Sequence, residues 1–156
     1  MGHLIESWAS LYSSHAALRT STEFLHIGGL VVSGGCAIAA DRITLRAARD
    51  DMATRRSELR ALDGTHRVVI VGLAVVIISG LLMFGADVDT FLYSKLFWLK
   101  MGLMVLLFVN GNVLLRAEHR AETGDPDGLR LLLLTAKTSL VLWMLTTLAG
   151  AALPNI

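Results

Sequence analysis

Four apolar stretches, at residues 24–40, 68–86, 96–115 and 131–153, make up about half of the chain. A helix needs roughly 20 apolar residues to cross the hydrocarbon core of a bilayer. Backbone polar groups in hydrocarbon must be hydrogen-bonded within their own segment, so these stretches are predicted to be helices. We therefore expect an all-α fold: an integral-membrane antiparallel four-helix bundle, with spans at about 22–42, 66–86, 95–116 and 130–153.

The composition fits that prediction. Hydrophobic residues make up 54% of the chain and charged residues 17%, and the mean hydropathy is +0.60. This is too apolar for an ordinary soluble domain. The formal net charge of +1 gives no indication of a nucleic-acid partner. The expected surroundings are the lipid bilayer, and the single cysteine, Cys36, excludes an internal disulfide.

The distribution of basic residues predicts the orientation. Ten of the fourteen lysines and arginines lie in two connections, 41–67 and 116–130. Short loops rich in lysine and arginine stay on the cytoplasmic side. We therefore expect a multi-pass membrane protein with both termini extracytoplasmic. Aromatic residues such as Trp8, Tyr93 and Trp98 would then mark the outer interface.

The first boundary is predicted from a capping pattern. Thr20 followed by Glu23 matches a capping box, so the first membrane helix is expected to begin near Ser21. Residues 1–20 are expected to form a short amphipathic helix on the outer surface, ahead of a bundle at 21–156. The first span is expected to continue into the cytoplasm to about Arg49.

Turn-forming sequences predict the later boundaries. The segment 85–89 is expected to end the second span, and 124–128 to interrupt the inner loop before the fourth. Connections this short are expected to place consecutive helices side by side and antiparallel.

His26 is the first polar residue inside a span that needs an explanation. It lies about one turn into the first helix, and the same face continues through Gly29 and Ser33. One interpretation is that these small residues only let another helix approach closely. The other is that an imidazole above a groove of small residues leaves room for a flat macrocycle, with His26 as the axial ligand of a haem iron.

Lys100 is the second such residue. An ammonium inside a span is costly unless it reaches the interface or faces a polar interior. Lys100 is therefore expected either to extend outward past Trp98 or to face inward at the depth of His26 and Glu23. In the second case Lys100 and Glu23 are candidate catalytic residues that hold a carboxylate or transfer a proton. Met83 is a candidate second ligand to iron, and Met101 and Met104 lie at a compatible depth.

A second polar layer is expected in the cytoplasmic half. Asp41, Asn110, Asn112 and Lys137 reach comparable depths in three different spans. An ion pair between Asp41 and Lys137, capped by the two asparagine amides, would form a structural clasp. The alternative is a pathway for ions or protons.

Two short motifs resemble a known superfamily. Glu23-Phe-Leu-His26-Ile-Gly-Gly opens the first span, and Leu96-Phe-Trp98-Leu-Lys100-Met opens the third. Over roughly 23–115 the chain resembles small bacterial four-helix membrane proteins: HemJ-type protoporphyrinogen oxidases, the membrane domain of CopD-type copper resistance proteins, and uncharacterised relatives, to which it is most similar. The resemblance implies haem b bound near His26, with Trp98 and Lys100 in the active region. The N-terminal segment and the arginine-rich inner loop depart from the HemJ pattern.

Three functions follow as hypotheses. The first is an inner-membrane haem-b redox protein acting on a porphyrin or quinone-like substrate. The second is a non-catalytic membrane subunit or assembly factor, which docks through the glycine-rich first helix against a second copy or a larger complex. The third is a small metal or proton transporter that uses Glu23, His26 and the methionines.

Overall fold

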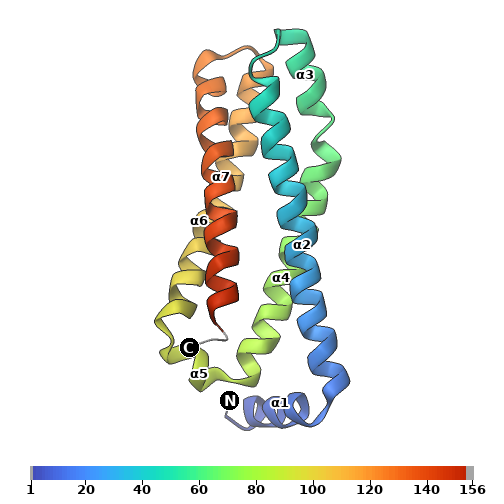
Figure 1. Ribbon diagram of the computed structural model, residues 1–156, viewed down its shortest axis with the longest axis vertical. Coiled ribbons are helices and arrows are strands. Elements are labelled where there is room, and N and C mark those ends of the chain that lie inside the picture. The colour runs from blue at the N-terminus through green and yellow to red at the C-terminus, as the bar shows by residue number, and fades with distance from the viewer. Residues whose placement is uncertain (1, 154–156) are drawn as a thin grey trace.

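The computed structural model describes residues 2–153, and every regular element in that part of the chain is a helix (Figure 1). Met1 and residues 154–156, which belong to the predicted segments 1–20 and 21–156, lie outside the described residues. The helices are α1 (Gly2–Ser14), α2 (Ala16–Ala47), α3 (Met52–Arg60), α4 (Asp63–Ala86), α5 (Val88–Tyr93), α6 (Lys95–Glu122) and α7 (Pro126–Ala152).

Four segments are long and apolar enough to cross a membrane: α2, α3 with α4, α6, and α7. Their outward surfaces carry large apolar side chains, such as Ile78, Leu81 and Val105, each about 60% exposed. Contiguous apolar surface of this extent is unusual on a soluble monomer and is compatible with contact to lipid. The prediction of an all-α chain with four candidate spans is confirmed.

The long helices associate as two closely packed pairs. α2 packs along α4, α6 packs along α7, and the two pairs meet where α2 contacts α7. Figure 1 shows α3 at one end of the molecule, and α1 and α5 at the other; we call these the α3 end and the α1 end. The expectation that all consecutive helices lie side by side was wrong for α4 and α6, which are not closely packed. The short helix α5 connects them.

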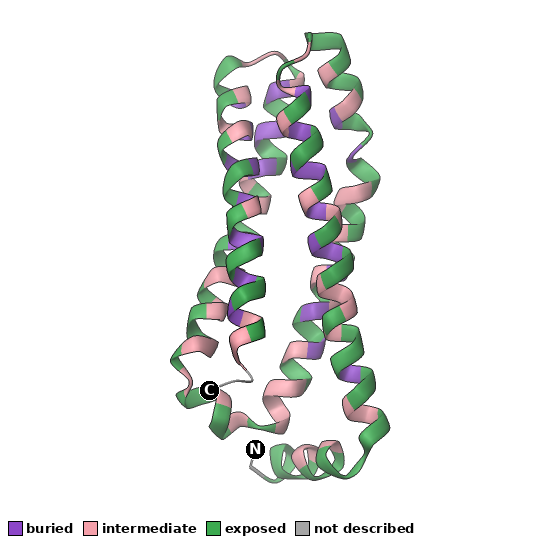
Figure 2. Ribbon diagram, in the orientation of Figure 1, coloured by how far each residue is buried: buried purple, intermediate pink, exposed green. Residues whose placement is uncertain are grey.

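The core is tightest at the α3 end. Alanines from three helices, Ala40, Ala117 and Ala136, meet the fully buried Leu59 and Leu132 there. Small side chains let helices approach closely, and Figure 2 shows buried positions gathered toward this end. A second cluster, which includes Leu107 and Trp143, fills the middle of the molecule. Beyond it, toward the α1 end, the two helix pairs diverge.

Glycines set the spacing of α2 and α4. A Cβ added at Gly72 would lie 2.8 Å from the Cβ of Ser33, and one added at Gly29 would lie 3.1 Å from the carbonyl oxygen of Gly72. The Ser33 hydroxyl donates to the Gly29 carbonyl in its own helix, so no polar atom of the serine needs a partner across the interface. Gly29 and Ser33 are therefore contact positions between two helices of the same chain.

The predicted capping box is wrong. Helix α2 begins at Ala16 after His15, whose backbone is extended, and no side chain caps it. Thr20 and Glu23 lie inside the helix because the four residues from Ala16 to Arg19 are good helix formers and extend it toward the N-terminus. The far boundary, Ala47, is close to the expected Arg49.

Helix α1 lies across the end of the molecule and is attached to α4 (Figure 1). The indole Nε1 of Trp8 donates to the carbonyl oxygen of Leu82 at 2.9 Å. Partial burial raises the pKa of the Tyr12 phenol, and the nearby Glu23 carboxylate adds to that effect. The predicted N-terminal helix is present, and its fixed contact with α4 was not expected from the sequence.

The turn between α6 and α7 forms where the sequence predicted it. Gly124 has a positive φ of 86°, which glycine adopts without strain. Asp125 caps α7 by accepting from the backbone N–H of Asp127 at 3.0 Å. The Arg120 guanidinium donates to the same carboxylate and holds the pKa of Asp125 below its usual value.

Candidate functional site

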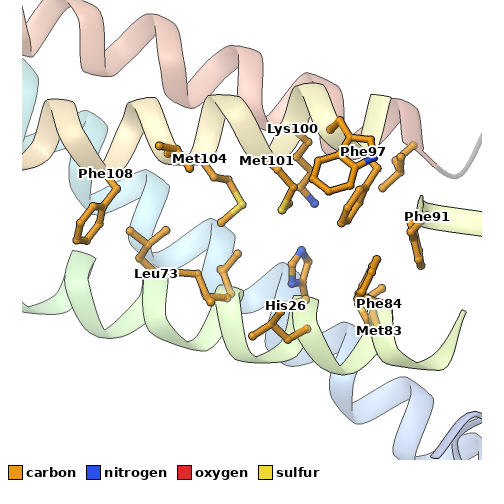
Figure 3. Close-up of a pocket in the computed structure, with 17 residues that line it drawn as sticks. His26, Leu73, Met83, Phe84, Phe91, Phe97, Lys100, Met101, Met104 and Phe108 are labelled. Carbon is orange, nitrogen blue, oxygen red and sulfur yellow. The ribbon is translucent and has the colours of Figure 1, made fainter. Parts of the chain in front are cut away.

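A cavity of about 630 Å³ lies between α4 and α6, toward the α1 end (Figure 3). Most of its wall comes from these two helices, while α2 contributes His26 and α5 contributes Phe91. This volume falls in the range of sites that bind small molecules and cofactors. The cavity therefore occupies the space that opens where the two helix pairs diverge.

His26 and Lys100 are the only ionisable residues that line this cavity within the described part of the chain. They come from opposite walls, and Figure 3 shows both side chains directed into the space between them. The predicted convergence of these two residues on one interior cavity is present in the structure.

Ser79 on α4 fixes the state of the His26 ring. Its hydroxyl lies 3.0 Å from Nδ1 of His26 and 2.6 Å from the carbonyl oxygen of Val75. A serine has one hydroxyl proton, and the carbonyl can only accept, so that proton goes to Val75. The hydroxyl oxygen must then accept from Nδ1–H of His26. The neutral ring therefore carries its proton on Nδ1, and the unprotonated Nε2 keeps its lone pair.

Gly80 gives the imidazole its space. A Cβ added at Gly80 would lie 3.2 Å from Cε1 of His26, closer than an ordinary contact. Gly80 leaves room for the ring, and the preceding residue, Ser79, holds it by a hydrogen bond. Figure 3 shows the far side of the ring turned toward the cavity. Nε2 is the atom left to bind a ligand there.

Lys100 crosses from α6 toward α7. A Cβ added at Gly150 would lie 3.5 Å from the Lys100 Nζ. Neither of the two ion pairs formed among residues 2–153 includes Lys100. The ammonium thus faces an apolar cavity, and no carboxylate of residues 2–153 forms an ion pair with it. An anionic group on a bound molecule would complete its interactions.

Methionine sulfurs lie on both sides of the cavity. Met83 is on α4, the helix that carries Ser79, and Figure 3 shows it beside Phe84 on the His26 side. Met101 and Met104 are on α6, across the cavity from the imidazole. A second axial ligand must bind iron from the face opposite the histidine. Met101 and Met104 fit that requirement better than Met83, the residue expected from the sequence.

Several residues predicted for the site lie elsewhere. Glu23 is exposed and does not line the cavity, so its predicted catalytic position is wrong. Gly29 and Ser33 pack against α4 and do not reach the cavity either. Trp98 does line it, and its indole N–H donates to the Leu92 carbonyl oxygen at 2.9 Å.

The predicted clasp of the second polar layer is not formed. Asp41 is buried beside Ser139, and one of its carboxylate oxygens has no partner. Lys137 is exposed and makes no ion pair with Asp41. Asn110 does connect α6 with α7 by donating to the Thr135 carbonyl oxygen at 3.0 Å. Asn112 is exposed and bonds within its own helix.

Sequence reasoning missed Ser79 and Gly80, and also a polar contact at the α3 end. A regular spacing could have revealed the first two, because Gly72, Ser79 and Gly80 recur on one face of an otherwise apolar helix. At the α3 end, the half-buried His66 lies 3.7 Å from the buried Glu118.

The residues of the cavity fit haem b. One imidazole has its Nδ1 proton engaged and its Nε2 free, which is the arrangement that orients a histidine ligand toward a metal. Aromatic and aliphatic side chains supply flat apolar walls, and the ammonium of Lys100 would form an ion pair with a carboxylate. Among residues 2–153, no three histidine, cysteine, aspartate or glutamate side chains group as a metal site made of side chains alone.

Comparison with known proteins places the chain in a family. The profile of a family of unknown function, DUF6644, matches residues 6–153. The chain belongs to this family. The match covers all seven helices nearly completely, so it includes the cavity and both of its ionisable residues. No curated protein and no solved structure matches the sequence.

Proposed function

We propose that this member of the DUF6644 family is a haem-b-binding redox protein of the bacterial inner membrane. The observation that carries the proposal is His26, whose Nδ1 is hydrogen-bonded to Ser79 while Nε2 is directed into an apolar cavity. A histidine arranged in this way is prepared to bind iron at Nε2. When bound, haem supplies a one-electron couple at its iron, with a potential set by the axial ligands and the burial of the site.

The residues of the chain have distinct roles in this proposal. Ser79 holds the imidazole in the tautomer that binds metal, and Gly80 leaves the ring its position. Lys100 binds a propionate carboxylate, since no carboxylate among residues 2–153 pairs with it. The apolar walls exclude water, which strengthens both contacts. Met101 or Met104 would be the second protein group to hold the haem, from α6.

Absorption spectra of the purified protein test this proposal. Protein produced with ample haem, or mixed with haemin in detergent, is expected to show a Soret band that His26→Ala removes. His66→Ala is the matched control, because His66 is also a half-buried histidine but lies at the α3 end. A folded protein that stays colourless with haemin, or a His26→Ala variant with an unchanged Soret band, would show that the proposal is wrong.

The proposed orientation places the α1 end outside the cytoplasm. The connections at the α3 end carry most of the arginines, and positively charged loops are retained in the cytoplasm. In this orientation both termini and the cavity lie toward the outer leaflet. For the second hypothesis, docking through the glycines of the first span, only Gly28 and Gly35 are free, because Gly29 and Gly34 already contact α4 and α7 of the same chain.

A further inference from the structure

Aromatic rings close the cavity at the α1 end. Phe84 of α4 and Phe97 of α6 stack with ring centroids 5.2 Å apart. Phe91 of α5 packs against both, at 6.4 Å from Phe84 and 5.6 Å from Phe97. Figure 3 shows the three rings together at one end of the cavity. This aromatic cluster separates the cavity from the end of the molecule where α1 and α5 lie.

The opposite end of the cavity is closed by the core. Leu73 and Phe108 lie there in Figure 3, and Leu73 also packs against the cluster around Leu107 and Trp143. From that level to the α3 end, small residues let the helices pack closely against one another. A molecule in the cavity therefore has no path along the axis of the helices toward the α3 end.

One lateral side is open between α4 and α6, which do not pack closely against each other. Side chains on both edges of this opening line the cavity and are also strongly exposed: Leu81 is 64% exposed, Val105 63% and Phe108 60%. All of them are apolar and lie within the candidate membrane spans. The surface outside this opening is therefore hydrocarbon if those spans are inserted.

We infer that the cavity exchanges its occupant directly with the bilayer, through the lateral opening between α4 and α6. The occupant is a flat, lipid-soluble molecule that carries an acidic group. The apolar edges match its body, and Lys100, which has no carboxylate partner within the described residues, matches its charge. The inference rests on the proposed function only for the choice of haem as that molecule.

Thiol labelling tests the opening without haem. In a Cys36→Ser background, Met104→Cys places a thiol inside the cavity, and Asp89→Cys places one on exposed α5 as a reference. Purified protein in vesicles is treated with pyrene maleimide, which dissolves in lipid, or with a sulfonated, membrane-impermeant methanethiosulfonate. Relative to Asp89→Cys, the sulfonated reagent is expected to react with Met104→Cys roughly a hundredfold more slowly, because a full charge partitions poorly into hydrocarbon. The lipid-soluble reagent is expected to react readily.

Two outcomes of the labelling overturn the inference. Rapid reaction of Met104→Cys with the sulfonated reagent would show a cavity open to water, and no reaction with either reagent would show a closed one. If Met104→Cys does not fold, Met101→Cys offers a second position in the same wall.

Blocking the opening tests the exchange itself. Val105→Cys and Leu106→Cys are neighbours on α6 with similar exposure, 63% and 55%, but only Val105 lines the cavity. Each is modified with pyrene maleimide and mixed with vesicles that contain haemin. Uptake, followed by the Soret band, is expected to slow severalfold or more for Val105→Cys and to stay unchanged for Leu106→Cys. Equal rates would overturn the inference. If even the unmodified protein takes up no haemin, the proposed function fails, and the thiol labelling still decides whether the opening exists.

Discussion

Ser79 illustrates how one side chain can decide the chemistry of another. Its only proton goes to the Val75 carbonyl oxygen, so its oxygen is an acceptor for His26. A serine inside an apolar helix commonly donates to a carbonyl of its own helix in this way, so that its hydroxyl proton is not left unpaired in lipid. Here the same arrangement leaves the Ser79 oxygen as an acceptor directed at His26. The proton of the imidazole therefore lies on Nδ1, and Nε2 keeps its lone pair.

Replacing Ser79 with alanine is therefore expected to weaken haem binding without removing it. Loss of a hydrogen bond behind a histidine ligand typically lowers metal affinity roughly 10- to 100-fold. Titration with haemin, read from the Soret band, measures the change, and Ser79→Thr, which keeps the hydroxyl, should recover most of the affinity. Ser33→Ala is the control, since Ser33 is also buried and bonded within its helix but lies outside the cavity. Equal losses in Ser33→Ala and Ser79→Ala would reduce the effect to general destabilisation.

Lys100 allows a test that separates charge from shape. Lys100→Gln keeps most of the side-chain volume and removes the charge that is proposed to bind a propionate. Haemin is expected to bind roughly 10- to 100-fold more weakly, the range for loss of a hydrogen bond to a charged group. The dimethyl ester of haemin, which has no propionate charge, should bind wild type and variant equally. Lys95→Gln serves as the control, because Lys95 begins the same helix, is exposed and does not line the cavity. A similar loss for haemin and its ester would argue against a charge contact.

Helix phase explains which polar residues of the predicted site were misplaced. The buried residues of α7 include Thr135, Ser139 and Thr146, and residues two positions apart on a helix point in nearly opposite directions. Lys137 is out of phase with this buried face and cannot reach Asp41. Depth along a helix could be read from the sequence, but the facing of each helix depends on which neighbour it packs against. The pairing of α2 with α4 and of α6 with α7 was expected from the short connections, but the face that each helix turns toward its neighbours was not.

The interface between α2 and α4 provides a test of that pairing. Gly72→Ala would bring a Cβ to within 2.8 Å of the Cβ of Ser33. Overpacking of this kind typically costs about 1–3 kcal/mol. Gly28→Ala is the matched control, because a Cβ there meets nothing within 4 Å and alanine favours a helix by about 0.5–1 kcal/mol. Thermal or denaturant unfolding in detergent should therefore place the two variants on opposite sides of wild type. A Gly72→Ala variant as stable as wild type would mean that α2 and α4 do not approach this closely.

The molecule as a whole is asymmetric along its length. Alanines and leucines pack four helices tightly at the α3 end, whereas aromatic and methionine side chains hold two helix pairs apart at the other end. Apolar length fixed the number of candidate spans in advance, because the requirement for internal backbone hydrogen bonds leaves few alternatives. The cavity could not be predicted in the same way, since it depends on the absence of close packing between α4 and α6. What the sequence did indicate is the convergence of His26 and Lys100, which follows from antiparallel helices, and the place of Met83 and Trp98 in the wall of the same cavity.

Because the cavity lies toward one end of the molecule, the orientation of the protein in the membrane decides which leaflet adjoins the lateral opening. Ser57 in α3 and Thr90 in α5 are both small, exposed hydroxyl residues at opposite ends of the molecule. With Cys36 replaced by serine, Thr90→Cys in intact bacterial cells should react with an impermeant maleimide, while Ser57→Cys should react only after the cells are lysed. This result is expected because the arginine-rich connections lie at the Ser57 end. The reverse labelling pattern would place the cavity beside the inner leaflet, and haem made in the cytoplasm could then reach it without crossing the bilayer.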